Sequence, residues 1–141
     1  MKKSSELITL KVYFSPKTFR EFEISGNASL YKLAEMINVF YGFLFDHPFG
    51  FYSDLDDFYE SKECYELFAD MGEPIGDNAK SVKKSTVANV FDVDGKAFLF
   101  LFDYGDEWSF KVERISAVVG DAPPQYSRLI RSVGKNPKQY G

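Results

Sequence analysis

The stretch AFLFLFDYGDEWSFKVE, residues 97–113, decides the fold of this chain. Every position from Phe98 to Phe102 is apolar, which is typical of a strand covered on both faces. The residues from Trp108 onward alternate between apolar and polar side chains. The pattern predicts one β-hairpin with the indole of Trp108 in the protein interior. Gly105 is expected to supply the positive φ that a tight connection needs.

Two hairpin registers are compatible with these residues. A three-residue loop over 103–105 places Phe100 opposite Trp108 and gathers the aromatic side chains on one face. A two-residue loop over 104–105 places Leu101 opposite Trp108 and leaves the phenylalanines as a patch that needs a cover. Aromatic cross-strand pairs add about 0.5–1.5 kcal/mol each, which favours the three-residue loop.

Length and composition predict one domain with a substantial core. The chain has 141 residues, so a single domain over residues 1–141 is expected. Aromatic residues make up 18% of the chain, which favours a sheet over a helical bundle. Residues 1–5 and about 133–141 are expected to form flexible tails.

Charge and cysteine content exclude several function classes. The net charge of −4 argues against general binding to phosphate backbones. Cys64 is the single cysteine, so neither an intramolecular disulfide nor a multi-cysteine zinc site can form. No apolar run approaches the roughly 20 residues of a membrane span, and polar residues follow Met1 where a signal peptide would be apolar. A cytoplasmic protein without membrane contact and without a cofactor is therefore expected.

Hydrophobic periodicity predicts the elements of the first half of the chain. They are strands over 7–14, 18–25 and 49–52, and a helix over 30–41. Asn27 or Ser29 is expected to cap this helix, and Gly42 to end it. The two first strands are expected to form a hairpin around Ser15-Pro16-Lys17.

The second half begins with an acidic segment, residues 53–78, in which Lys62 is the single basic residue. A helix is predicted over 58–71, with Phe58, Cys64 and Leu67 or Phe68 facing inward. A short helix capped by Ser85 is expected to follow, with Val87, Val90 and Phe91 facing inward. From Ser127 the chain carries basic residues and no acid, which is typical of a solvated tail.

The order of these elements predicts an α+β fold. A hairpin, a crossing helix and further strands follow the β-grasp order, in which a mixed sheet wraps one main helix. The prediction is a β-grasp-like mixed sheet packed on one helix, with a central Phe/Trp-rich hairpin and a helical acidic insertion.

The run Phe98-x-Phe100-x-Phe102-Asp103-Tyr104-Gly105-Asp106-x-Trp108 resembles the central motif of the plasmid pRiA4b ORF-3-like family. His47 before a short aromatic strand, and Ala122-Pro123-Pro124-Gln125-Tyr126, also follow the family's order. The resemblance implies a small α+β domain of bacteria or archaea, in some cases encoded on plasmids or mobile elements. It departs from the family where many relatives carry a histidine, here Phe110, and a downstream cysteine. By the motif, the candidate binding residues are His47, Asp103, Tyr104, Gly105, Asp106, Trp108 and Tyr126.

The candidate residues for a metal site or an acid–base site are Asp103, Asp106 and His47. Two carboxylates near a histidine can hold a cation or act as an acid–base pair. The structural alternative is that Asp103 bonds its own turn, Asp106 is solvated, and His47 is a packing residue before Pro48. Cys64 is expected to be buried and unreactive, since no histidine lies near it in the sequence.

Three functions remain compatible with these residues. The first is a non-enzymatic interaction module that presents a sheet edge or an aromatic face to a protein partner or to its own copy. The second is a nucleic-acid-associated accessory protein of a mobile element. It would bind through Lys2, Lys3, Lys80, Lys83, Lys84 and the basic tail. The third is a metal-assisted hydrolase that uses His47, Asp103 and Asp106.

Overall fold

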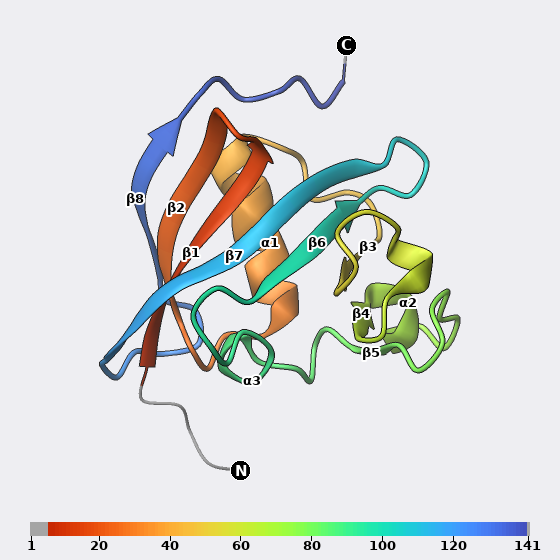
Figure 1. Cartoon of the computed structure of the whole chain (residues 1–141), viewed down its shortest axis with the longest axis horizontal. Coiled ribbons are helices and arrows are strands. Elements are labelled where there is room, and N and C mark those ends of the chain that lie inside the picture. The colour runs from red at the N-terminus through yellow and green to blue at the C-terminus, as the bar shows by residue number, and fades with distance from the viewer. Residues whose placement is uncertain (1–5, 141) are drawn as a thin grey trace.

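The computed structural model describes residues 6–140 (Figure 1). Its strands are β1 (Glu6–Ser15), β2 (Thr18–Ser25), β3 (Phe49–Tyr52), β4 (Cys64–Glu66), β5 (Lys80–Ser81), β6 (Ala97–Phe102), β7 (Trp108–Val119) and β8 (Ser127–Val133). Its helices are α1 (Leu30–Tyr41), the 3-10 turn η1 (Phe58–Glu60), α2 (Leu67–Asp70) and α3 (Val87–Val90). The tail predicted over residues 1–5 lies outside the described residues.

One eight-stranded sheet organises the molecule, in the order β5-β4-β3-β6-β7-β1-β2-β8. Each neighbouring pair is antiparallel except β4 and β5, which run parallel, so the sheet is mixed. Helix α1 lies behind the long strands in Figure 1 and packs its apolar side into the main core. An α+β fold with a mixed sheet and one main helix is therefore confirmed.

Helix α1 begins and ends where capping chemistry places its ends. The Ser29 hydroxyl accepts a hydrogen bond from the backbone of Lys32 at 3.0 Å, so Ser29 and not Asn27 is the cap. Gly42 ends the helix with φ of 71°, a left-handed conformation that glycine adopts without strain. The Tyr41 hydroxyl donates to the carbonyl of Val12 at 2.7 Å and fixes the end of the helix to β1.

The central hairpin is present, but its loop is longer than either predicted one. Phe102 lies opposite Trp108, and Phe100 lies opposite Phe110, so residues 103–107 form the connection. The Glu107 amide donates to the Asp103 carbonyl at 2.6 Å and closes the five-residue turn. The positive φ values fall on Asp103 (67°) and Glu107 (52°), and not on Gly105.

Both registers predicted from the sequence are therefore wrong. The observed pairing differs by two residues from that of the three-residue loop. Because side chains alternate with a period of two, this shift keeps Phe100, Phe110 and Trp108 on the expected common face.

Strand β6 is covered on both sides from Phe100 to Phe102, as its apolar run predicts, whereas Ala97 and Leu99 are partly buried. Phe98, Phe100 and Phe102 have no exposed surface and face the main core. On the opposite face Leu101 packs with Tyr52 and neighbouring side chains under the acidic segment. The phenylalanines consequently offer no aromatic surface to a partner.

The prediction of a helix over residues 58–71 is wrong. Cys64, Tyr65 and Glu66 form strand β4, which pairs with β3, so only short helical turns remain on either side. Pairing with a sheet edge outweighs the local helical periodicity here. The cap of α3 is Thr86, whose hydroxyl accepts from the Asn89 amide at 3.3 Å, and not Ser85.

The stretch from Ser127 was expected to be a solvated tail, but it forms β8 and pairs with β2. Arg131 lies opposite Glu21, with 3.2 Å between the guanidinium and the carboxylate. Arg128 approaches Glu23 in the same way at 3.9 Å. The isolated basic charges of the sequence therefore have acidic neighbours on the adjacent strand.

Arg20 ties the C-terminal segment to the end of α1. Its side chain is 3% exposed. The guanidinium donates to the carbonyls of Phe40 at 3.1 Å, Val133 at 2.9 Å and Gly134 at 3.1 Å, and to the side chain of Asn136. One buried arginine thus satisfies carbonyl groups from segments that lie far apart in the sequence.

The variant Arg20→Met is expected to lower the free energy of unfolding by about 3 kcal/mol, because it removes the hydrogen bonds that a buried guanidinium donates to several partly buried carbonyl groups. Urea denaturation measures this loss. The matched control is Arg131→Met, at a side chain that is 54% exposed. It should cost less than about 0.5 kcal/mol, and equal losses in the two variants would contradict the anchoring role.

Trp108 faces the interior as expected, although it is only half-buried. Its ring lies 4.9 Å from Phe43, just after α1, and 5.9 Å from Phe14. Its indole Nε1 is buried without a hydrogen-bond partner among the described residues. The indole therefore contributes packing and no hydrogen bond.

Truncation by Trp108→Ala is expected to cost about 3 kcal/mol, the lower end of the range for a core tryptophan. The conservative Trp108→Phe keeps most ring contacts and removes the unpartnered N–H, so its cost should stay below about 1.5 kcal/mol. Thermal and urea unfolding check both values. An unchanged midpoint in Trp108→Ala would show that the indole does not stabilise the fold.

Candidate functional site

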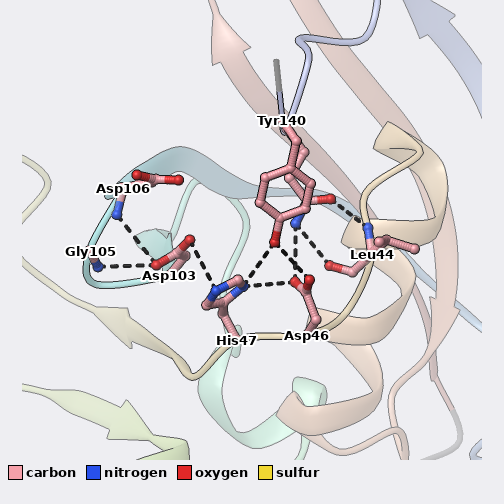
Figure 2. A network of polar contacts seen from close by, with 8 residues as sticks. Leu44, Asp46, His47, Asp103, Gly105, Asp106 and Tyr140 are labelled. Atoms are coloured by element: carbon pink, nitrogen blue, oxygen red, sulfur yellow. Dashed lines mark hydrogen bonds and ion pairs between the residues drawn. The ribbon is translucent and has the colours of Figure 1, made fainter.

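A cluster of polar side chains gathers where the central hairpin meets the C-terminal segment (Figure 2). His47 lies at its centre, between two carboxylates. Its Nδ1 is 2.7 Å from Oδ1 of Asp46, and its Nε2 is 3.5 Å from Oδ2 of Asp103. The structure thus brings His47 and Asp103, two residues selected from the sequence, into contact. Asp46, His47, Asp103, Gln139 and Tyr140 are called the hairpin-tip cluster below.

Asp103 is held by the turn that it begins. Its Oδ1 accepts from the amides of Gly105 at 3.1 Å and Asp106 at 3.3 Å. Its own amide donates to the carbonyl of Pro48 at 2.9 Å. This is the Asx-turn predicted as the structural alternative, and it leaves Oδ2 directed at His47.

Two residues near the C-terminus complete the cluster, and sequence reasoning missed both. The Tyr140 hydroxyl donates to Oδ2 of Asp46 at 2.7 Å. The side chain of Gln139 accepts from the Leu44 amide at 2.7 Å and donates to the Leu44 carbonyl at 3.0 Å. No local pattern could indicate these contacts, since they join residues more than 90 positions apart.

The Tyr140–Asp46 hydrogen bond shifts both titrations. It is the main cause that lowers the pKa of the Asp46 carboxyl, and the contact with His47 lowers it further. The same bond is the main cause that raises the pKa of Tyr140 to about 12. The phenol therefore stays protonated at neutral pH and serves as a hydrogen-bond donor, not as a base.

The Tyr140 hydroxyl is expected to titrate near pH 12 in the native protein and near its ordinary value in Asp46→Asn. A raised folded-state pKa means that the contribution to stability is complete below the unfolded pKa and is lost as the pH rises through the folded one. The carbon shift of the Tyr140 ring, followed by NMR, measures the titration. Tyr126→Phe is the control and should leave it unchanged, whereas a Tyr140 titration unaffected by Asp46→Asn would contradict the contact.

The contacts of the hairpin-tip cluster join the loop after α1 to the C-terminal segment and to the turn of the central hairpin. Both imidazole nitrogens of His47 face carboxylates, and the Tyr140 hydroxyl, 3.4 Å from Nδ1 of His47, is a protonated donor. Over residues 6–140, no group of three or more His, Cys, Asp and Glu side chains is placed to hold a metal ion. Asp106 is exposed to solvent, and it takes part in the turn through its backbone amide, which donates to Oδ1 of Asp103. The geometry therefore gives no support to a metal-assisted hydrolase on these residues.

Tyr104 points away from the hairpin-tip cluster to the other face of the sheet. Its hydroxyl lies 2.7 Å from that of Tyr52, which donates to the buried carboxylate of Glu66 at 2.6 Å. Glu66 also accepts from the amides of Ile75 at 2.8 Å and Gly76 at 3.1 Å. Burial raises the pKa of both tyrosines far above the ordinary value. This second polar network holds the acidic segment on the sheet.

The absence of a side chain at one glycine makes room for this network. A Cβ at Gly50 would lie 2.8 Å from the Tyr52 ring and 2.9 Å from the Tyr104 hydroxyl. Cys64 lies nearby and is 4% exposed, so the predicted burial of the thiol is confirmed. Burial also raises its pKa, which disfavours the reactive thiolate.

Tyr126 belongs to neither network. Its hydroxyl donates to Glu23 at 2.8 Å, and its carbonyl accepts from the Ser25 amide at 3.1 Å, at the start of β8. Trp108 packs into the core beside Phe43. The seven residues selected from the sequence are thus distributed over four places, and only His47, Asp103, Gly105 and Asp106 come together.

These features define a class: an α+β domain in which a mixed eight-stranded sheet carries a polar cluster at the tip of its central hairpin. The chain belongs to the family described as plasmid pRiA4b ORF-3-like protein, which matches residues 7–139. The resemblance inferred from the hairpin motif is thereby confirmed.

Among solved structures, the chain is similar to a protein of unknown function from Methanosarcina mazei Go1. The TM-score is 0.69 at 19% identity, over 93% of this chain and 72% of that chain. At this identity the similarity shows a shared fold. No curated protein matches the sequence significantly. None of the described helices is long and apolar enough to cross a membrane.

Proposed function

We propose that this domain is a non-enzymatic interaction module that binds an extended acidic segment of a partner protein along β8. The observation that carries the proposal is the position of β8. It is a seven-residue strand at one end of the sheet order, and its neighbour is β2 alone. An unpaired strand edge presents amide and carbonyl groups to which another strand can add.

The side chains of β8 favour an acidic partner. Leu129 and Ile130 are 41% and 43% exposed, which gives the edge apolar contact surface. Arg128 and Arg131 are 61% and 54% exposed beside them. Their acidic neighbours on β2 are far less exposed, so the cationic groups face the solvent. The charged side chains of β8 itself are both cationic, and exposed cationic groups favour association with an acidic segment.

An irregularity in β8 disfavours pairing between two copies of the chain. The register with β2 shifts between Glu21 and Phe22, so Ile130 has no direct partner across the strands. A bulge and positive side chains are common devices against edge-to-edge association of identical sheets. A partner of opposite charge is therefore the better occupant.

The nucleic-acid alternative finds less support. Lys80 lies on β5, at the opposite end of the sheet from β8, with Lys83 in the turn that follows β5. The ammonium groups of Lys80 and Lys83 lie over the rings of Tyr65 and Tyr31. The basic residues therefore do not form one patch, and the two lysines near the N-terminus lie outside the described residues.

We propose a β-grasp-like scaffold for this module because of the order of its secondary-structure elements. Hairpin β1–β2 and helix α1 come first, and hairpin β6–β7 follows after the intervening segment from β3 to α3. Strand β7 runs antiparallel to β1 at the centre of the sheet, so the likeness lies in the order and in the helix packed on one face.

A synthetic peptide of alternating glutamate and valine is expected to shift the amide resonances of residues 127–133 in NMR titration. A peptide of alternating lysine and valine should not. The double variant Arg128→Glu/Arg131→Glu should weaken binding about fivefold, as expected for two exposed charge pairs. The control is Lys62→Glu on the acidic segment.

The result that would overturn the proposal is a set of shifts confined to other strands, or equal binding of the two peptides. Light scattering that shows a dimer disrupted by the Arg128→Glu/Arg131→Glu change would assign β8 to a second copy of the chain instead.

A further inference from the structure

Strands β1 and β7 separate at one end, and a groove opens between them. Their pairing ends at Tyr13 opposite Lys111, although β1 continues to Ser15 and β7 begins already at Trp108. At the same end of β1, its register with β2 shifts between Tyr13 and Ser15. A bulge of this kind bends the strand that contains it.

The groove has a volume of about 490 Å³, within the range of small-molecule sites. Its lining residues are Tyr13, Phe14, Ser15, Pro16, Leu99, Ser109, Phe110 and Lys111. Phe14 and Phe110 are in ring contact at 5.8 Å, and Phe14 is 40% exposed. The surface is therefore mainly aromatic and apolar, and it suits a flat ring.

Among the residues that the structure describes, Lys111 is the one charged residue in the lining, and no carboxylate lines the groove. Its ammonium group lies 5.8 Å from the centre of the Tyr13 ring and 3.8 Å from Glu113 on the same strand. The side chains of this ion pair are 48% and 27% exposed, and an exposed pair of that kind is weak. The ammonium group is thus able to turn toward an anion in the groove.

We propose that this groove binds a small aromatic anion, whose ring packs on Tyr13, Phe14 and Leu99 and whose acidic group is bound by Lys111. The ring of such a ligand would match the aromatic and apolar lining of the groove. Its acidic group would match the cationic side chain of Lys111. This site does not depend on the interaction proposed for β8, because none of its lining residues belongs to β8 or to its neighbour β2.

Two fluorescent probes of the same shape test the proposal. Anilinonaphthalene sulfonate carries an anionic group, whereas N-phenylnaphthylamine lacks it. The full chain should bind the anionic probe at micromolar concentration and the neutral probe at least about fivefold more weakly, the ratio given by one favourable charge contact of about 1 kcal/mol. Near-UV circular dichroism must stay native, because the anionic probe also binds partly unfolded proteins.

Three variants locate the site. Lys111→Gln should weaken binding of the anionic probe about fivefold and leave the neutral probe unchanged, whereas the control Lys62→Gln should alter neither. Ser109→Trp places a ring in the groove from an exposed position and should abolish binding of both. NMR amide shifts of Ser109 and Lys111 on addition of the anionic probe to the unaltered chain locate the binding site without any variant.

Absence of probe binding to the native chain would overturn the site. An unchanged affinity in Lys111→Gln would overturn the assignment of the anion. Amide shifts elsewhere, or full binding in a folded Ser109→Trp protein, would overturn the location.

Discussion

Burial of β6 on both faces is the constraint on which the rest of the structure depends. A strand that is apolar at every position cannot lie at the surface of a sheet, so it requires a cover on each side. On one side Phe98, Phe100 and Phe102 join the core under α1. On the other side Leu101 needs a second layer, and the acidic segment provides it.

The attachment of this second layer explains why the carboxylate of Glu66 is buried, although burial of a charge destabilises a fold when it lacks partners. The acidic segment packs Phe58 on Tyr52 and Phe68 on Tyr104, and polar contacts add to this packing. Glu66 does this by accepting hydrogen bonds from Tyr52 and from two backbone amides of the loop that returns to β5. A buried charge with several donors is tolerated, whereas one without them would destabilise the fold. Arg20 plays the same part for the C-terminal segment through carbonyl groups.

The candidate site was predictable only in its local part. The Asx-turn of Asp103 follows from the residue type and its place before Gly105, and the structure contains it. A site that combines His47 with Asp103 was a hypothesis from the family motif, and the structure brings the two side chains into contact. Asp46 and Tyr140 could not be found, since their contact joins the loop after α1 to the far end of the chain. Tyr126 was selected by motif order alone, and the fold places it elsewhere.

Local sequence patterns were enough to predict the first hairpin, the limits of α1, the burial of β6 and the face of the aromatic residues. These depend on side-chain periodicity and on caps, which act over a few residues. The tertiary structure alone decided the length of the central turn, the strand at Cys64 to Glu66 and the pairing of β8 with β2. Strand pairing joins residues distant in the chain, and its hydrogen bonds and cross-strand contacts outweigh a local helical or solvated preference that is worth only tenths of a kcal/mol per residue.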